Sequence, residues 1–148
     1  MPKQVLVVDD DQNAVKYLSA LLTEHGYEPR AAYDGAEGLQ QVRQARPDLI
    51  VLDVMMPKKS GFVLFKQLKQ DQAYAEIPII MVTGVTGMLE ELRQPGEKYD
   101  KPYDSLRESL KQKIDEMRQE GLVKPEMFLD KPIDPDAFIA KIRELLGA

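Results

Sequence analysis

The sequence predicts an α/β fold built on a doubly wound parallel sheet, and three observations support this prediction. Five short apolar segments of strand length alternate along the chain with stretches of helical periodicity. Several of these segments end in acidic or other polar residues, as strands do when their carboxyl ends open onto a ligand crevice. The chain of 148 residues has the length of one domain, so we expect residues 1–148 to form a single domain. Such alternation favours right-handed crossovers and helices on both faces of the sheet.

The predicted strands are short runs of apolar and β-branched residues. They are residues 5–8, 27–32, 49–53, 77–82 and 127–129. The run Leu49-Ile50-Val51-Leu52 is apolar at every position, which is typical of a central strand that is buried on both faces. Residues 27–32 are less apolar and contain Pro29, which indicates an edge strand.

The predicted helices begin at polar capping residues and carry apolar stripes. Asp11 and Asp34 are placed to cap the first two helices, and Asp134 followed by Pro135 opens the last one. Gly26 is placed to end the first helix. The stripes expected to face the sheet are Ala14, Leu18, Leu21 and Leu22; Leu39 and Val42; Phe62, Leu64, Phe65 and Leu68; and Phe138, Ile142, Leu145 and Leu146.

The stretch 84–126 breaks this alternation, because a crossover between parallel strands needs only about a dozen residues. Ser105 and Glu108 form a capping box. The helix that they open carries a narrow apolar stripe of Leu106, Leu110, Ile114 and Met117. We therefore expect an inserted helical segment at about residues 86–124. Two alternatives stay open: the helix covers its own domain, or it forms an interface with a partner or with a second copy in a homodimer.

Composition excludes several classes of function. The net charge of −5 argues against a general affinity for nucleic acid or anionic membranes. Without cysteine the chain has no disulfide, thiol nucleophile or cysteine-based zinc site. No apolar run approaches the roughly 18 residues of a membrane span, and the N-terminus lacks the apolar core of a signal peptide. We expect a cytoplasmic protein.

Acidic residues follow two of the predicted strands. Asp9 and Asp10 come directly after the first strand, and Asp53 ends the central one. The carboxyl ends of parallel strands meet at one edge of the sheet, where a buried carboxylate is costly unless it has a partner. A Mg²⁺ ion binds through one or two carboxylates and keeps positions for water and phosphate oxygens. An Asp in such a cluster can also act as a nucleophile and form an aspartyl phosphate.

Two further strand ends carry groups suited to a phosphoryl oxygen, namely the ammonium of Lys131 and the hydroxyl of Thr83. Each residue also has an ordinary interpretation when it is taken alone. Asp53 could be a structural carboxylate, Thr83 a β-branched strand residue and Lys131 a solvated lysine. The set together favours phosphoryl chemistry, in which a metal neutralises the transferred group.

Four spaced motifs resemble the receiver domain of two-component response regulators. They are Val7-Val8-Asp9-Asp10-Asp11, Leu52-Asp53-Val54-Met55-Met56-Pro57 with Gly61, Met81-Val82-Thr83-Gly84, and Asp130-Lys131-Pro132. The resemblance covers about residues 3–84 and 126–147. It implies a flavodoxin-like five-stranded sheet with strand order 2-1-3-4-5. It also implies a phospho-acceptor response regulator in a two-component phosphorelay, which is not a turnover enzyme.

The resemblance implies a role for each site residue. Asp53 would accept the phosphoryl group from a histidine kinase or a phosphotransfer protein. Asp10, Asp53 and the backbone carbonyl of Met55 would bind Mg²⁺, with Asp9 acting through water. Lys131 would bridge to the phosphoryl group. The phosphorylated domain would then signal to a downstream protein through changed protein contacts.

The switch residues implied by the resemblance are Thr83, which would move toward the phosphoryl group, and Phe128, at the position of the family's switch aromatic. The alternative for Phe128 is an ordinary core residue. Met55 and Val85 would flank the phosphoryl group, and neither side chain can orient an attacking water. We therefore expect slow self-dephosphorylation.

Two other functions stay open from the sequence. One is an aspartate-nucleophile phosphohydrolase of the haloacid-dehalogenase type. Such enzymes need a second Asp two residues after the nucleophile, and Met55 at that position argues against turnover. The other is a pseudo-receiver that acts as a scaffold without phosphorylation, which the presence of all the site residues disfavours.

Overall fold

The computed structural model describes residues 2–54, 61–83, 128–130 and 133–147, together with residues 112, 115, 116 and 119. In the described part of the chain strands and helices alternate as the sequence predicts. In order they are β1 (Gln4–Val8), α1 (Gln12–Glu24), β2 (Glu28–Ala32), α2 (Gly35–Gln44), β3 (Leu49–Asp53), α3 (Gly61–Gln70), β4 (Ile79–Thr83), β5 (Phe128–Asp130) and α6 (Pro135–Leu146).

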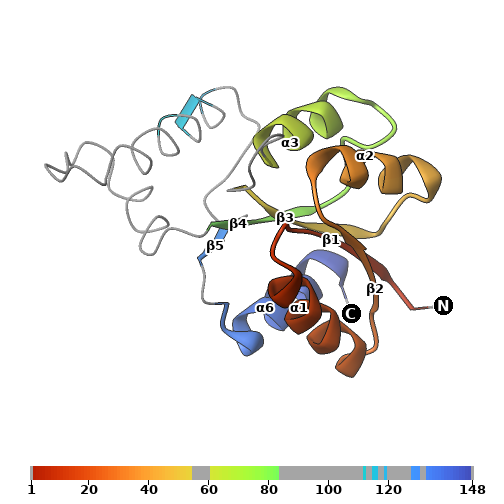
Figure 1. Cartoon of the computed structure of the whole chain (residues 1–148), viewed down its shortest axis with the longest axis vertical. Helices are drawn as coiled ribbons and strands as arrows, with labels where there is room; N and C mark the ends of the chain where they lie inside the picture. The colour runs from red at the N-terminus through yellow and green to blue at the C-terminus, as the bar shows by residue number, and fades with distance from the viewer. Residues whose placement is uncertain are drawn as a thin grey trace, which may run out of the picture.

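The strands form one sheet of five parallel strands in the order β2-β1-β3-β4-β5 (Figure 1). This confirms the predicted fold class and strand order. β3 lies in the centre, and all five of its residues are buried. β2 is an edge strand, where the missing N–H of Pro29 is tolerated. The fourth strand begins at Ile79 rather than at residue 77, because Pro78 has no N–H to donate to the ladder.

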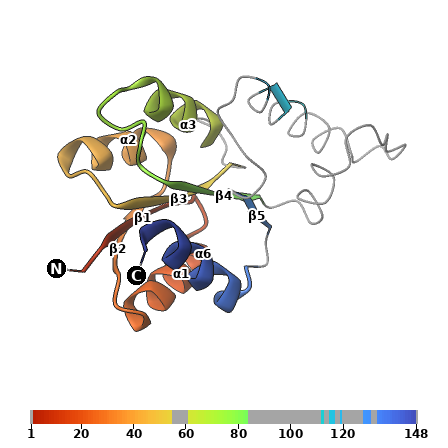
Figure 2. The same ribbon diagram turned by 180° about the vertical axis from the view of Figure 1, so that it is seen from behind.

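Helices cover both faces of the sheet (Figures 1 and 2), with α1 and α6 on one face and α2 and α3 on the other. Alternate residues of each strand point to opposite faces. Leu6, Val8, Ile50 and Leu52 pack in one core cluster with side chains of α2 and α3. Val5, Val7, Leu49 and Val51 pack in a second cluster with side chains of α1 and α6. The sheet therefore separates two apolar layers.

The predicted helix starts are confirmed, because the side chains of Asp11, Asp34 and Asp134 each accept a backbone N–H in the first turn of their helix. One predicted inward residue is wrong. Leu145 is 41% exposed, while Ile139 is buried and Leu146 is partly buried. The buried stripe of α6 steps by four residues from Ile142 to Leu146, so Leu145 falls on its outer side.

The predicted insertion at about residues 86–124 lies outside the described residues, apart from Gln112, Asp115, Glu116 and Gln119, which are helical. The single-domain assignment of residues 1–148 therefore stays a prediction.

None of the helices in the described ranges combines the length and the apolar character that a crossing of the membrane requires.

Candidate functional site

Three carboxylates converge at the carboxyl edge of the sheet. One oxygen from each of Asp9, Asp10 and Asp53 lies within 4.8 Å of the others. Asp9 and Asp53 are only 2% and 5% exposed, whereas Asp10 is exposed. The structure thus brings together the three acidic residues that the strand ends predicted would meet.

The position of the cluster follows from the winding of the chain. β1 and β3 are neighbours in the sheet, with Val8 opposite Leu52 in the register. The helix after β1 lies on one face and the helix after β3 on the other (Figure 1). Two adjacent strands whose connections leave in opposite directions form a crevice between them at their carboxyl ends, which is where ligands bind in open α/β sheets.

The β1–α1 turn is held by a series of hydrogen bonds. The backbone N–H of Asp9 donates to the carbonyl oxygen of Ala32 at 3.1 Å, which ties the end of β1 to β2. The N–H of Asp11 donates to Oδ1 of Asp9 at 2.9 Å. Oδ1 of Asp11 in turn accepts from the N–H of Asn13 at 2.9 Å and of Ala14 at 3.4 Å. Asp11 is therefore the N-cap of α1, and Asp10 lies in a turn bonded on both sides.

The β3–α3 side has a backbone hydrogen bond after Asp53 and close packing at Gly61. The N–H of Val54 donates to the carbonyl oxygen of Val82 at 3.0 Å, which extends the sheet one residue beyond Asp53. Gly61 is buried against this segment. A Cβ atom added to Gly61 would overlap the carbonyl oxygen of Asp53 and lie 2.8 Å from Cα of Val54. Only glycine fits here without a shift of the backbone. The sequence shows Gly61 only as part of a motif and does not predict its close approach to Asp53.

The donor set of the cluster fits a hard divalent cation. Its ligand atoms are carboxylate oxygens, which Mg²⁺ prefers. Three negative groups within 4.8 Å repel one another, and the repulsion is stronger for the two that are buried. A bound cation would remove this repulsion. The exposed carboxylate of Asp10 leaves the cluster accessible from solvent.

The other predicted site residues are described only in part. Thr83 ends β4 and is paired with Asp130 of β5, which places its backbone one strand away from Asp53. Met55 and Lys131 lie outside the described residues. Phe128 is 1% exposed and belongs to the core cluster on the α2 and α3 face, which supports its alternative interpretation as a core residue. Its role as a switch stays a prediction.

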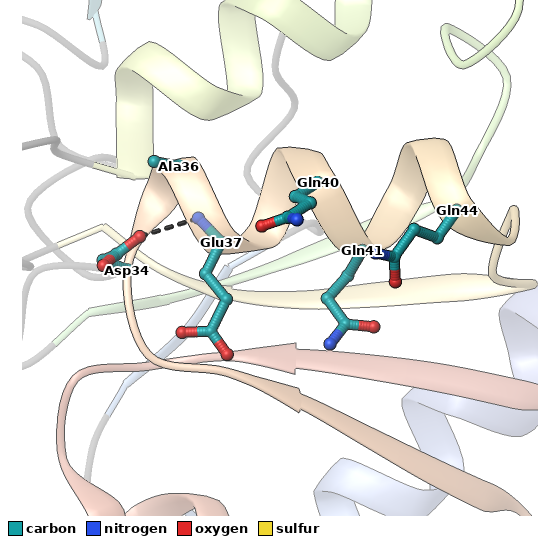
Figure 3. Close-up of a pocket in the computed structure, with 6 residues that line it drawn as sticks. All are labelled: Asp34, Ala36, Glu37, Gln40, Gln41 and Gln44. Atoms are coloured by element: carbon teal, nitrogen blue, oxygen red, sulfur yellow. Dashed lines mark hydrogen bonds between the residues drawn. The ribbon is translucent and has the colours of Figure 1, made fainter.

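Two hollows in the described part of the surface lie away from this cluster. One, of about 560 Å³, runs along the outer side of α2 (Figure 3) and is lined by polar side chains and one alanine. Its residues are Asp34, Ala36, Glu37, Gln40, Gln41 and Gln44. The other, of about 490 Å³, is lined by residues of α2, α3 and the turn after α3. Neither hollow includes a residue of the acidic cluster.

The fold and the site together define a phospho-receiver type of domain: a parallel sheet with an acidic cluster at the junction of β1 and β3. The family model of the response regulator receiver domain matches residues 5–97. This chain belongs to the response regulator receiver family, and its function is that of a receiver in two-component phosphorelay signalling. The receiver family is a family of signalling domains that are generally not turnover enzymes, so the phosphohydrolase alternative is not favoured. The scaffold alternative is not favoured either.

Relatives of known name support this assignment along the whole chain. The polar-differentiation response regulator DivK of Brucella anthropi is 32% identical over 147 residues, which are 99% of this chain and 98% of that protein. The DNA-binding dual master transcriptional regulator RpaA of Synechocystis sp. is 30% identical over 146 residues; this chain spans 49% of its length. Among solved structures, the chemotaxis protein CheY4 of Vibrio cholerae superposes with a TM-score of 0.72 at 28% identity, covering 99% of this chain and all of that one.

Proposed function

We propose that Asp53 is the phospho-acceptor of this receiver and that phosphorylation depends on Mg²⁺. The observation that carries the proposal is the buried carboxylate of Asp53 at the end of β3, within 4.8 Å of Asp9 and Asp10. Asp53 lies at the carboxyl end of the central strand, where ligands bind in open α/β sheets. A carboxylate beside a bound cation can act there as a nucleophile toward phosphorus.

The step is a transfer of a phosphoryl group between two nucleophiles. An oxygen of Asp53 forms a bond to phosphorus while the bond from phosphorus to the donor breaks, and the donor leaves with the electron pair. For a phosphohistidine donor the leaving atom is an imidazole nitrogen. Asp10, Asp53 and the carbonyl of Met55 would hold Mg²⁺, with Asp9 acting through water. The cation would supply neutralisation of the charge on the phosphoryl oxygens.

Two cationic or polar groups complete the proposed site. Lys131 would pair with a phosphoryl oxygen, and Thr83 would move to hydrogen-bond another. The end of β4, where Thr83 lies, is one strand away from Asp53. This proximity is what supports its role as the moving residue.

The proposed partners follow from the family. A histidine kinase or a phosphotransfer protein would supply the phosphoryl group, and a downstream protein would read the phosphorylated form. The net charge of −5 supports protein partners over nucleic acid. We propose a cytoplasmic location, since family members of this kind meet their kinases there. A homodimer through the inserted segment is a further proposal.

The test is phosphorylation by a small donor. Incubation of the full chain with acetyl phosphate and Mg²⁺ is expected to add one phosphoryl group by intact mass, and chelation of Mg²⁺ is expected to abolish it. Asp53→Asn removes the nucleophile with little change of shape and is expected to show no addition. Asp136→Asn is the matched control, because it changes an exposed carboxylate in the first turn of α6. No mass increase in the parent protein, or an increase retained in Asp53→Asn, would contradict the proposal.

The second expectation concerns loss of the phosphoryl group. The side chains of Met55 and Val85, which would flank it, cannot position water for attack, so we expect slow self-dephosphorylation. The measurement is the decay of the phosphorylated mass after removal of acetyl phosphate. A half-life of seconds would show that another group orients the water.

A further inference from the structure

In the part of the chain that the structure describes, three helices begin at an Asp N-cap. α1, α2 and α6 each have an Asp as N-cap, with extended backbone and a carboxylate that accepts an N–H from the first turn. The cap bonds are Asp11 Oδ1 to Asn13 N at 2.9 Å, Asp34 Oδ1 to Glu37 N at 2.7 Å, and Asp134 Oδ2 to Ala137 N at 3.0 Å. All three are carboxylate caps, but Asp11 bonds the N–H of the second helical residue, with a longer bond of 3.4 Å to the third, whereas Asp34 and Asp134 bond the third.

Asp11 also differs from Asp34 and Asp134 in its own backbone N–H. This N–H donates to the carboxylate of Asp9, at 2.9 Å from Oδ1. A residue of the acidic cluster is thus bonded to the residue that caps α1. Asp10 lies between them, so its position depends on the same turn. Of the three caps, Asp11 is the one that the described hydrogen bonds link to the cluster.

We propose that Asp11 is a positioning residue for the metal site. The carboxylate of Asp11 caps the first turn of α1 and so fixes the position of the Asp11 backbone N–H. This N–H donates to the carboxylate of Asp9 and thereby orients it, together with the turn that carries Asp10. This inference rests on the proposed function, because it assumes that the cluster binds Mg²⁺. Groups that hydrogen-bond to metal ligands and orient them affect the affinity for the metal.

The geometry of the turn determines how far apart the ligand oxygens lie. Asp9 and Asp10 stand in this turn, and their carboxylate oxygens lie within 4.8 Å of each other and of Asp53. A cap that holds the turn keeps the ligands in place and lowers the ordering cost of binding. Without the cap the turn is free to relax, and the cation must restore the arrangement.

Asp11 could instead act as one more negative charge near the cation, and the chain offers a way to separate the two effects. Asn is as good an N-cap as Asp, because its amide oxygen accepts the same N–H bonds. Asp11→Asn therefore removes the charge and keeps the cap. Asp11→Ala removes both. Asp34→Ala and Asp134→Ala remove a carboxylate cap elsewhere.

The experiment is calorimetric titration of the full chain with MgCl₂, with unfolding followed separately by circular dichroism. Asp11→Ala is expected to bind Mg²⁺ about tenfold more weakly, at the lower end of the range for groups behind metal ligands. Asp11→Asn is expected to stay within about twofold of the parent, since the cap is kept. Asp34→Ala and Asp134→Ala are expected to lose similar stability and to bind Mg²⁺ as the parent does.

A kinetic measurement gives an independent readout. With acetyl phosphate as donor, Asp11→Ala is expected to need about tenfold more Mg²⁺ for half of its maximal phosphorylation rate, while the maximal rate is kept. Parent-like affinity in Asp11→Ala, equal weakening in Asp34→Ala, or failure of Asp11→Asn to rescue each overturns the inference and leaves the proposed function standing. A parent protein that binds no Mg²⁺ overturns both.

Discussion

α1 and α3 follow the two strands that carry the acidic cluster, and the structure describes a different kind of contact at each helix. Both ends of α1 are fastened by hydrogen bonds. Asp11 caps its start, and the ring Nδ1–H of His25 donates to the carbonyl oxygen of Leu21 at 2.8 Å near its end. α3 begins at the buried Gly61, where an added Cβ atom would overlap the carbonyl oxygen of Asp53. The β1 side of the acidic site thus has a side-chain cap that another side chain can replace, and the β3 side has a close backbone approach that only glycine allows.

The kind of contact determines which substitutions each side of the site tolerates. A hydrogen bond from a side chain can be made by another side chain of similar shape, as Asn for Asp at a cap. Where only the hydrogen atom of glycine fits, no other residue can replace glycine without a shift of the backbone. We therefore expect the β1 side to tolerate conservative changes and the β3 side, which carries the proposed nucleophile, to tolerate none at Gly61.

The largest effect is expected for Gly61→Ala. The added Cβ would meet the backbone of Asp53 and Val54, which cannot rotate away as a side chain can, so α3 or the end of β3 must move. Overpacking of this kind destabilises by about 3 kcal/mol. The measurement is the free energy of unfolding in urea, together with Mg²⁺ affinity, which should also fall because Asp53 is displaced.

Gly38→Ala is the matched control, because it too adds a methyl group to a buried helical glycine. The atoms nearest to the added Cβ would be side-chain atoms, Cδ2 of Leu64 at 3.0 Å and the methyl groups of Val8 at 3.3 Å. These can adjust, and alanine gains about 1 kcal/mol over glycine in a helix interior. We expect a net change near zero. A loss as large as that of Gly61→Ala would mean that backbone contact is not what separates the two positions.

The parts of the structure that the sequence predicts are those set by local patterns. The apolar run of β3 and the Asp caps are visible in the chain, because strand burial and capping depend on a few adjacent residues. The meeting of Asp9 with Asp53 follows from strand ends that share one edge. The contact of Gly61 with Asp53 depends on the path of the chain between them, which no local pattern specifies.

For some core residues, too, the local sequence pattern does not decide whether the side chain is buried. Leu145 fits the helical period as well as Leu146 does, but a small rotation of α6 on the sheet decides which of them is covered. For Phe128 the sequence left two interpretations open, and its burial beside Met81 supports the core. In both cases tertiary packing determines which side chain is buried, and the local sequence pattern does not.

The smallest predicted effect concerns Lys69 near the end of α3, which makes a hydrogen bond to the turn that follows the helix. Nζ of Lys69 donates to the carbonyl oxygen of Ala75 at 3.0 Å and lies 5.7 Å from the centre of the Phe65 ring. Partial burial lowers the pKa of Lys69 from its usual 10.5. Between the lowered pKa and 10.5 the unfolded chain binds more protons than the folded one, so the contribution of Lys69 to the free energy of unfolding rises with pH across this window.

Lys69→Met keeps the stem that packs on Phe65 and removes the titrating group. The free energy of unfolding of the parent minus that of Lys69→Met is expected to increase as the pH is raised from neutral toward 10.5, by a small amount because the group is partly exposed to solvent. Denaturation of both proteins in urea at several pH values measures it, and titrations of other groups cancel in the difference. A difference that falls with pH would mean that the folded state favours the charged form, so that the bond to Ala75 outweighs desolvation. In that case the hydrogen bond of Lys69 to Ala75 would hold the end of α3, as the bond of His25 to Leu21 holds the end of α1.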